Sequence, residues 1–178
     1  MERRNLVLLL AGIILLGIIM ATNANYSIIV FPLFLIFLTV KDRVVPLFKN
    51  LPFPTFLLFL LIGLIVSFIL EWGVGVDELK KNPSHSWLNN WLSLSIFYLL
   101  WLAGSYWIIK RFKLTPKGVF IVTSLFGILI EQQFQFFQIL SSFNPAIIIF
   151  WVLYVPLAYT PVILIPYLIL KNKTLNNG

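Results

Sequence analysis

Six apolar segments, each close to or above the length needed to cross a lipid bilayer, constrain the fold of this chain more than any motif does. A helix needs about 20 mostly apolar residues to span a hydrocarbon core of about 30 Å. The segments run over residues 5–21, 25–40, 54–71, 88–109, 117–140 and 145–170. This pattern predicts an all-α polytopic membrane protein, a compact bundle of six transmembrane helices that forms a single domain over residues 1–178.

The overall composition agrees with this class of protein. Hydrophobic residues make up 60% of the chain and charged residues 11%, whereas a soluble domain averages about 45–50% apolar and about 25% charged residues. The chain has no cysteine and a single histidine, His85. Disulfides, a thiolate nucleophile and a metal site built from several histidines are therefore excluded, and we expect neither a metal nor a cofactor.

The basic residues predict an orientation in the membrane. Eleven of the 13 fall at the two ends of the chain or between alternate segments, and only Lys80 and Lys81 fall on the opposite side. The eleven are Arg3, Arg4, Lys41, Arg43, Lys49, Lys110, Arg111, Lys113, Lys117, Lys171 and Lys173. Under the positive-inside rule, both termini are cytoplasmic and the loops at residues 22–25, 72–87 and 141–144 are external. Insertion in the cell membrane explains the net charge of +7, so we expect the lipid bilayer, and no nucleic acid, as a partner.

The first two segments are short, and they leave two alternatives open. Arg3 and Arg4, the apolar run that follows and the small residues 22–24 also match a signal peptide with its cleavage site. Alternatively, the two segments form a re-entrant hairpin that does not fully cross the membrane, because the charges that flank the pair lie on one side in either case.

A polar face in the fifth segment is the main candidate for a binding site. Its members follow one another at spacings of three or four residues and therefore share one side of a helix. They are Thr123, Gly127, Glu131, Gln135 and Gln138. A carboxylate in hydrocarbon is costly, so an embedded glutamate is by default a functional candidate. We predict a polar pocket in the outer half of the bundle, with Glu131 as its key group, assisted by Gln132, Gln135 and Gln138; the alternative is that the glutamines only link helices.

The third segment repeats part of this pattern. Gly63, Ser67 and Glu71 have the same spacing of four as Thr123, Gly127 and Glu131, and both segments run outward from the cytoplasm. Small residues let helices approach closely, so the two faces could pack together and bring both glutamates to one site. Alternatively, the match is a coincidence and Glu71, next to Trp72, is a solvated residue at the membrane interface.

The external loop before the fourth segment supplies a further set of polar side chains. They are Asp77, Glu78, His85, Asn89 and Asn90. These residues could form an entrance or lid over the pocket, or they could simply be a solvated loop surface. His85 is the only side chain with an ordinary pKa near neutral pH.

A stripe of large side chains follows one side of the fourth segment. It comprises Trp87, Trp91, Leu94, Tyr98, Trp101 and Ser105. Such a stripe typically packs against a neighbouring helix. The alternative is an aromatic wall that faces a ligand.

These features favour a function in the membrane without identifying a reaction. Phosphate-binding loops, zinc-protease motifs and hydrolase nucleophile elbows are absent from the sequence. The leading hypothesis is that the pocket binds a lipid or other small amphiphile for transport. The second is a membrane-embedded enzyme that uses Glu131, with or without Glu71, as general acid and base. The third is a scaffold subunit that assembles with other membrane subunits.

Overall fold

The computed structural model describes residues 3–22, 26–82, 84, 86–133 and 145–176, and this part of the chain is all-helical. The helices are α1 (Arg3–Thr22), α2 (Val30–Lys49), α3 (Thr55–Lys81), α4 (Trp87–Phe112), α5 (Pro116–Gln133) and α7 (Pro145–Asn176), with a short 3₁₀ turn, η1 (Tyr26–Ile28), before α2. The predicted all-α fold is confirmed for these residues.

Within the described ranges, four helices are long and apolar enough to cross a membrane: Arg3–Thr22, Thr55–Lys81, Trp87–Phe112 and Val152–Lys171. α2 carries Lys41, Asp42 and Arg43 in its interior, and the apolar part of α5 is the shorter stretch Pro116–Ile128. Long apolar helices of this kind suggest a membrane protein.

Two helices end well beyond their predicted limits. α2 begins at Val30 and continues to Lys49, so the charges placed in a loop after residue 40 lie on a helix instead. α3 continues to Lys81, so most of the expected external loop at residues 72–87 is helical as well. The apolar run of α3 ends before the helix does, because Glu78, Leu79 and the two lysines that follow are good helix formers in polar surroundings.

The last turn of α3 is stabilised by two ion pairs. Lys80 Nζ lies 3.2 Å from Asp77 Oδ1, and Lys81 Nζ lies 2.8 Å from Glu78 Oε1, both at a spacing of three residues. The two lysines also complement the negative end of the helix dipole. Asp77 and Glu78 therefore lie on a helix and pair with their own neighbours.

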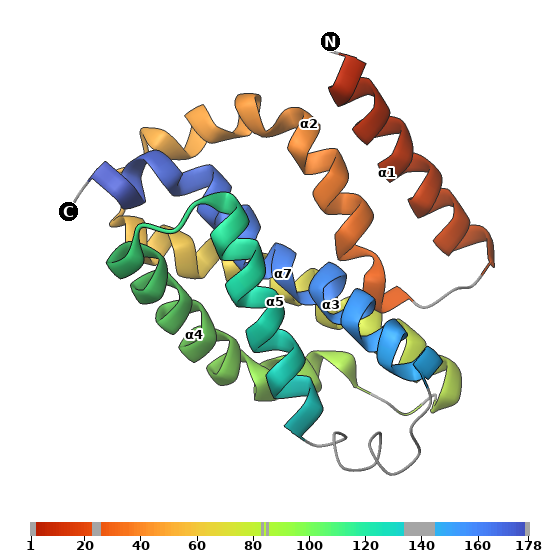
Figure 1. Ribbon diagram of the computed structural model, residues 1–178. Coiled ribbons are helices and arrows are strands. Elements are labelled where there is room, and N and C mark those ends of the chain that lie inside the picture. The colour runs from red at the N-terminus through yellow and green to blue at the C-terminus, as the bar shows by residue number, and fades with distance from the viewer. Residues whose placement is uncertain (1–2, 23–25, 83, 85, 134–144, 177–178) are drawn as a thin grey trace.

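α3 and α7 form the centre of the bundle (Figure 1). α3 packs against α4 and α7, and α7 also packs against α2 and α5. α1 lies at the periphery and packs on α2, where its Gly12 faces Pro32 and Ile36. The fully buried side chains come mainly from α3, α4 and α7 and include Phe59, Leu102, Val162, Ile163 and Tyr167.

Glycines permit the closest helix contacts. A Cβ added to Gly63 of α3 would overlap the side chain of Leu102 on α4. A Cβ added to Gly73 would overlap the backbone carbonyl of Tyr26 in η1. Because lipid chains are as apolar as a protein core, close packing of this kind contributes much of the stability of helices in a membrane.

α5 is held on α7 by polar contacts as well as by packing. The hydroxyl of Tyr167 donates a hydrogen bond of 2.7 Å to the carbonyl of Leu114, at the turn between α4 and α5. Further along, Ser124 Oγ and Thr160 Oγ1 lie 3.2 Å apart and share a buried hydrogen bond. α5 is thereby fixed to α7, and its other side is left facing α4.

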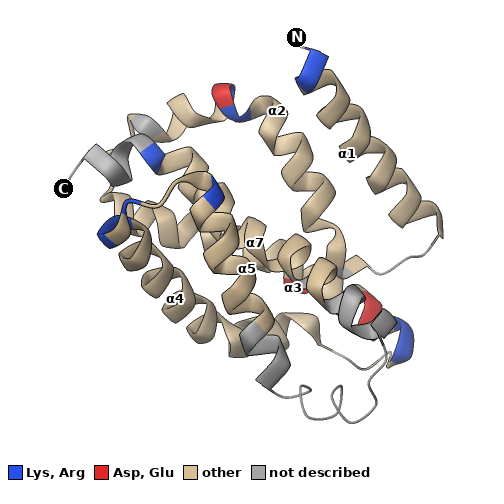
Figure 2. Cartoon of the chain, viewed as in Figure 1, with Lys and Arg blue, Asp and Glu red and all other residues tan. Residues whose placement is uncertain are grey.

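Many of the basic residues lie at one end of the bundle, whereas those at the start of α1 lie apart from it and Lys80 and Lys81 lie at the opposite end (Figure 2). The end with many basic residues holds the α2–α3 and α4–α5 junctions and the C-terminal end of α7 (Figure 1). Asp77 and Glu78 lie near the α3–α4 junction at the opposite end. The described helices therefore alternate in direction (Figure 1), and the orientation predicted from the charges stays a prediction.

Candidate functional site

The aromatic stripe of α4 has two different environments. In its first half, Trp87 and Trp91 both contact the ring of Phe68 on α3 edge to face, with centroids 5.1 and 5.2 Å apart. Trp91 Nε1 also donates a hydrogen bond of 3.4 Å to Ser67 Oγ. This half packs against a neighbouring helix, as the first interpretation of the stripe predicts.

Glu71 is buried where α3 meets this half of α4. The residue is 5% exposed. Its Oε1 accepts a hydrogen bond of 2.5 Å from the hydroxyl of Tyr98, and its Oε2 accepts a longer one of 3.5 Å from Asn90 Nδ2. The interpretation of Glu71 as a solvated interfacial residue is therefore wrong, because its carboxyl group lies inside the α3–α4 contact.

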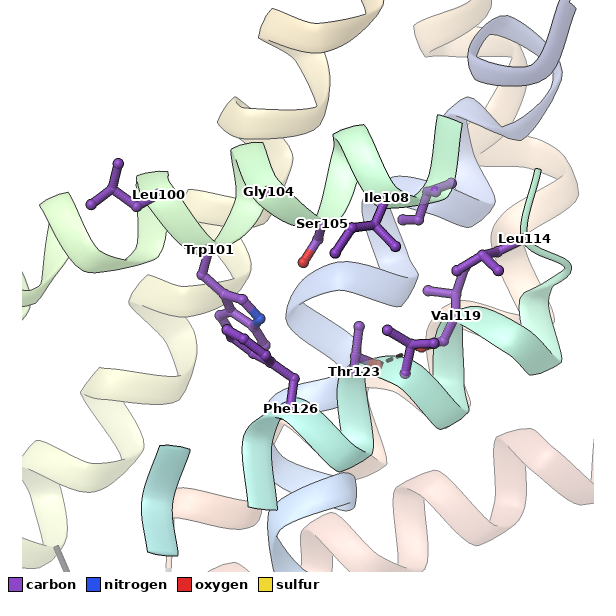
Figure 3. Close-up of a pocket in the computed structure, with 11 residues that line it drawn as sticks. Leu100, Trp101, Gly104, Ser105, Ile108, Leu114, Val119, Thr123 and Phe126 are labelled. Atoms are coloured by element: carbon purple, nitrogen blue, oxygen red, sulfur yellow. Dashed lines mark hydrogen bonds between the residues drawn. The ribbon is translucent and has the colours of Figure 1, made fainter. Parts of the chain in front are cut away.

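In its second half, α4 diverges from α5 and leaves a cavity of about 140 Å³ (Figure 3). The contacts of α5 lie mainly with α7, so the two helices that are consecutive in the chain do not close against each other. The cavity is lined by Leu100, Trp101, Gly104, Ser105, Ile108, Ile109, Leu114, Val119, Val122, Thr123 and Phe126. None of these eleven residues carries a charge.

The indole of Trp101 forms one wall of the cavity. Its ring stacks on Phe126 of α5, with centroids 6.2 Å apart and planes 16° apart, and meets Tyr159 of α7 edge to face. Trp101 is 7% exposed, and its Nε1 has no hydrogen-bond partner in the described part of the chain. The nitrogen lies on the ring edge that faces Ser105 and Thr123 (Figure 3). A buried donor without a partner is rare and costs about 1–3 kcal/mol.

Two hydroxyl groups supply the remaining polar atoms of the lining. Thr123 Oγ1 donates to the carbonyl of Val119 at 2.8 Å, so its hydrogen is already used within α5. Ser105 is buried on α4, one residue beyond Gly104, with its hydroxyl oxygen directed toward the cavity (Figure 3). The site thus combines mostly apolar walls with a small polar patch around Trp101.

The cavity opens on the outer surface of the bundle. Leu100 and Val122, on opposite walls, are 70% and 37% exposed. One turn after Leu100 on α4, a Cβ added to Gly104 would meet no atom within 4 Å. The cavity is therefore open to the side, between α4 and α5.

The structure leaves most of the predicted polar pocket undescribed. Glu131 and Gln132 lie in the last turn of α5, but their side chains are outside the described residues. Gln135, Gln138 and His85 lie outside them entirely. The site predicted around Glu131 therefore stays a prediction.

The other predicted site residues are separated from the cavity. Asn89 is exposed at the start of α4, where its backbone N–H is capped by Ser86. Asn90 contacts Glu71 on the α3 side of α4. The small faces predicted on α3 and α5 also have different surroundings, since Gly63 meets Leu102 of α4 and Thr123 lines the α4–α5 cavity.

The fold and the site together define an all-helical protein with four candidate membrane-spanning helices in its described part and a laterally open apolar cavity between α4 and α5. No protein-family model, curated protein or solved structure matches the chain. Its site is therefore interpreted from its own chemistry.

Proposed function

We propose that the protein binds a lipid or other small amphiphile inside the membrane and that the cavity between α4 and α5 receives an apolar part of that ligand. The observation that carries this proposal is an apolar cavity of about 140 Å³ that opens sideways and is lined by a buried indole N–H with no partner among the described residues. Protein interiors are otherwise close-packed and nearly all of their buried donors are paired, so an open apolar cavity beside such a donor supports a binding site.

The size of the cavity limits what it holds. An apolar cavity of about 150 Å³ in another protein stays dry and binds benzene. The α4–α5 cavity has room for a similar volume, which corresponds to one ring or a short segment of an alkyl chain. The rest of a larger amphiphile would leave past Gly104 into the surrounding lipid.

Transport of the bound amphiphile is the use that we propose, with the six helices crossing the cell membrane and both termini in the cytoplasm. Support for the orientation comes from the basic residues at one end of the bundle (Figure 2). In this arrangement the cavity lies in the cytoplasmic half, next to the α4–α5 junction. Glu131 follows Phe126 by five residues along α5, about 7.5 Å at 1.5 Å per residue, and belongs to the outer half.

Filling the cavity tests the proposal. Gly104→Leu places a side chain where a Cβ meets nothing within 4 Å, and Gly17→Leu makes the same change at an equally open, exposed position on α1. In native mass spectrometry of gently purified protein, we expect a defined small mass on the wild type and on Gly17→Leu. We expect Gly104→Leu to lose it. Equal retention of that mass by all three proteins, or only bulk lipid on each of them, would contradict the proposal.

A further inference from the structure

We infer that the ligand of the α4–α5 cavity carries an uncharged hydrogen-bond acceptor, a carbonyl oxygen in the simplest case, which pairs with the indole N–H of Trp101. This inference rests on the proposed function, because it requires that the cavity is a binding site. It adds the chemical class of the ligand and names Trp101 as the residue that selects it.

The first argument is the state of the Trp101 donor. The side chain is buried between α4, α5 and α7, and its Nε1 is the one buried side-chain nitrogen or oxygen atom without a partner among the described residues. Trp91, ten residues earlier on the same stripe, donates to Ser67. Within the described residues, the tryptophan is therefore paired where α4 meets α3 and unpaired where α4 lines the cavity.

The second argument is that, among the described residues, neither hydroxyl of the cavity lining, Ser105 or Thr123, accepts a hydrogen bond from Trp101 Nε1. The hydroxyl of Thr123 is directed to the carbonyls of Val119 and Phe120, at 2.8 and 3.2 Å. Trp101 is held between Phe126 and Tyr159, so its ring cannot turn to reach another partner without breaking both contacts. An acceptor brought into the cavity removes the cost of the orphaned donor.

The third argument excludes an anionic acceptor. None of the lining residues is cationic, and a carboxylate or phosphate without a counter-charge is strongly disfavoured in an apolar site. A neutral carbonyl requires only one donor and is tolerated among apolar walls. The matching ligand is an alkyl chain or ring that bears an ester, ketone or quinone oxygen, with its apolar remainder leaving between Leu100 and Val122.

A pair of probes that differ only in the acceptor tests the inference. Binding of radiolabelled 2-dodecanone and dodecane is measured with the protein in lipid nanodiscs. The proteins are wild type, Trp101→Phe, Gly104→Leu and the control Gly17→Leu. The preference for the ketone is compared between variants, because partition of each probe into the nanodisc lipid then cancels.

We expect wild type and Gly17→Leu to prefer the ketone about tenfold more than Trp101→Phe does, which is the effect of one hydrogen bond to a buried donor. Gly104→Leu should weaken the binding of both probes. If Gly104→Leu weakens both probes but Trp101→Phe keeps the preference of wild type, the inference is wrong and the binding function stands. If Gly104→Leu changes neither, the binding function fails as well.

A second measurement protects the test against misfolding of Trp101→Phe. In wild type with ¹⁵N-labelled tryptophan, the indole signal of Trp101 should move on addition of the ketone and stay in place with dodecane. Identical responses to both probes would overturn the inference. A medium-chain alkyl quinone and dioctanoylglycerol then distinguish the sources of the carbonyl, since only the matching one should shift the signal at low concentration.

Discussion

The hydroxyl of Tyr98 donates a hydrogen bond of 2.5 Å to Oε1 of Glu71 and thereby joins α4 to α3 in the interior of the protein. Both residues are buried, at 2% and 5% exposure. Three residues further along α4, Trp101 contacts the ring of Tyr98, with centroids 6.2 Å apart, and forms the wall of the cavity. The Tyr98–Glu71 contact therefore fixes the part of α4 from which the cavity is built.

Removal of the Tyr98 hydroxyl should lower stability measurably. In Tyr98→Phe the buried carboxyl of Glu71 loses its shortest hydrogen bond, and we expect a loss of about 1–2 kcal/mol in the free energy of unfolding. The measurement is thermal unfolding of both proteins in the same detergent.

Tyr106→Phe is the matched control on the same helix. Tyr106 packs edge to face on Phe56 and Phe59, and its hydroxyl makes no hydrogen bond to the described residues. We expect this variant to unfold close to the wild-type temperature. Equal destabilisation by the two substitutions would mean that the Tyr98–Glu71 hydrogen bond contributes nothing specific.

Gly73→Ala should destabilise the contact between α3 and η1. The new Cβ would lie 2.9 Å from the carbonyl carbon of Tyr26 and closer still to its oxygen, so the backbone of η1 must move. Overpacking of this kind costs about 1–3 kcal/mol. Gly17→Ala, where a Cβ meets nothing within 4 Å, should be neutral or slightly stabilising. Thermal unfolding compares the two, and equal midpoints would show that α3 and η1 are less closely packed than described.

The helices could be predicted from the apolar runs, but their ends could not. Segment 88–109 corresponds closely to α4, Trp87–Phe112, because polar residues and a left-handed Lys113 follow at once. α3 continues ten residues past Glu71 through Gly73 and Gly75, which look like helix breakers in a sequence. Both glycines are needed for packing, since added Cβ atoms would overlap Tyr26 and Trp87. That requirement depends on tertiary contacts, which hydropathy does not contain.

The candidate site could be predicted only in part for the same reason. The interpretation of the α4 stripe as a packing surface is confirmed for Trp91, which packs on α3. Trp101 lines the cavity, and the interpretation of this part of the stripe as a wall that faces a ligand stays a prediction. The cavity itself depends on α5 packing against α7, through Ser124 and Thr160, rather than against α4. In the sequence, the one local indication of the cavity is the pair of small residues Gly104 and Ser105, which follows Trp101 by about one helical turn.

Accessibility of two engineered cysteines tests the proposed orientation. The chain has no cysteine, so Ser84→Cys and Lys113→Cys are single-cysteine proteins without further changes. Ser84 is exposed at the α3–α4 junction, and Lys113 is exposed at the α4–α5 junction. In intact cells we expect an impermeant thiol reagent to label Ser84→Cys at least tenfold more than Lys113→Cys, with equal labelling after lysis. The reverse pattern would place the basic end outside and move the cavity to the outer half.

Neutralisation of Glu131 tests whether the polar end of α5 takes part in binding. Glu131→Gln keeps the size of the side chain but removes the carboxyl group, and the loss of one charge-assisted contact corresponds to about tenfold weaker binding. Native mass spectrometry should therefore show less of the small bound mass on Glu131→Gln than on wild type. The exposed Glu78, paired with Lys81, supplies the control Glu78→Gln, which should retain the mass.

Comparison with Gly104→Leu then separates the two parts of the proposed site. Loss of the mass in both variants would indicate one amphiphile that contacts the polar end of α5 and the α4–α5 cavity together. Loss in Gly104→Leu alone would leave the cavity as the binding site and remove Glu131 from it. A heavier protein partner, retained equally by every variant, would favour the scaffold subunit over the binding function, because such a partner needs neither the carboxyl group nor the open cavity.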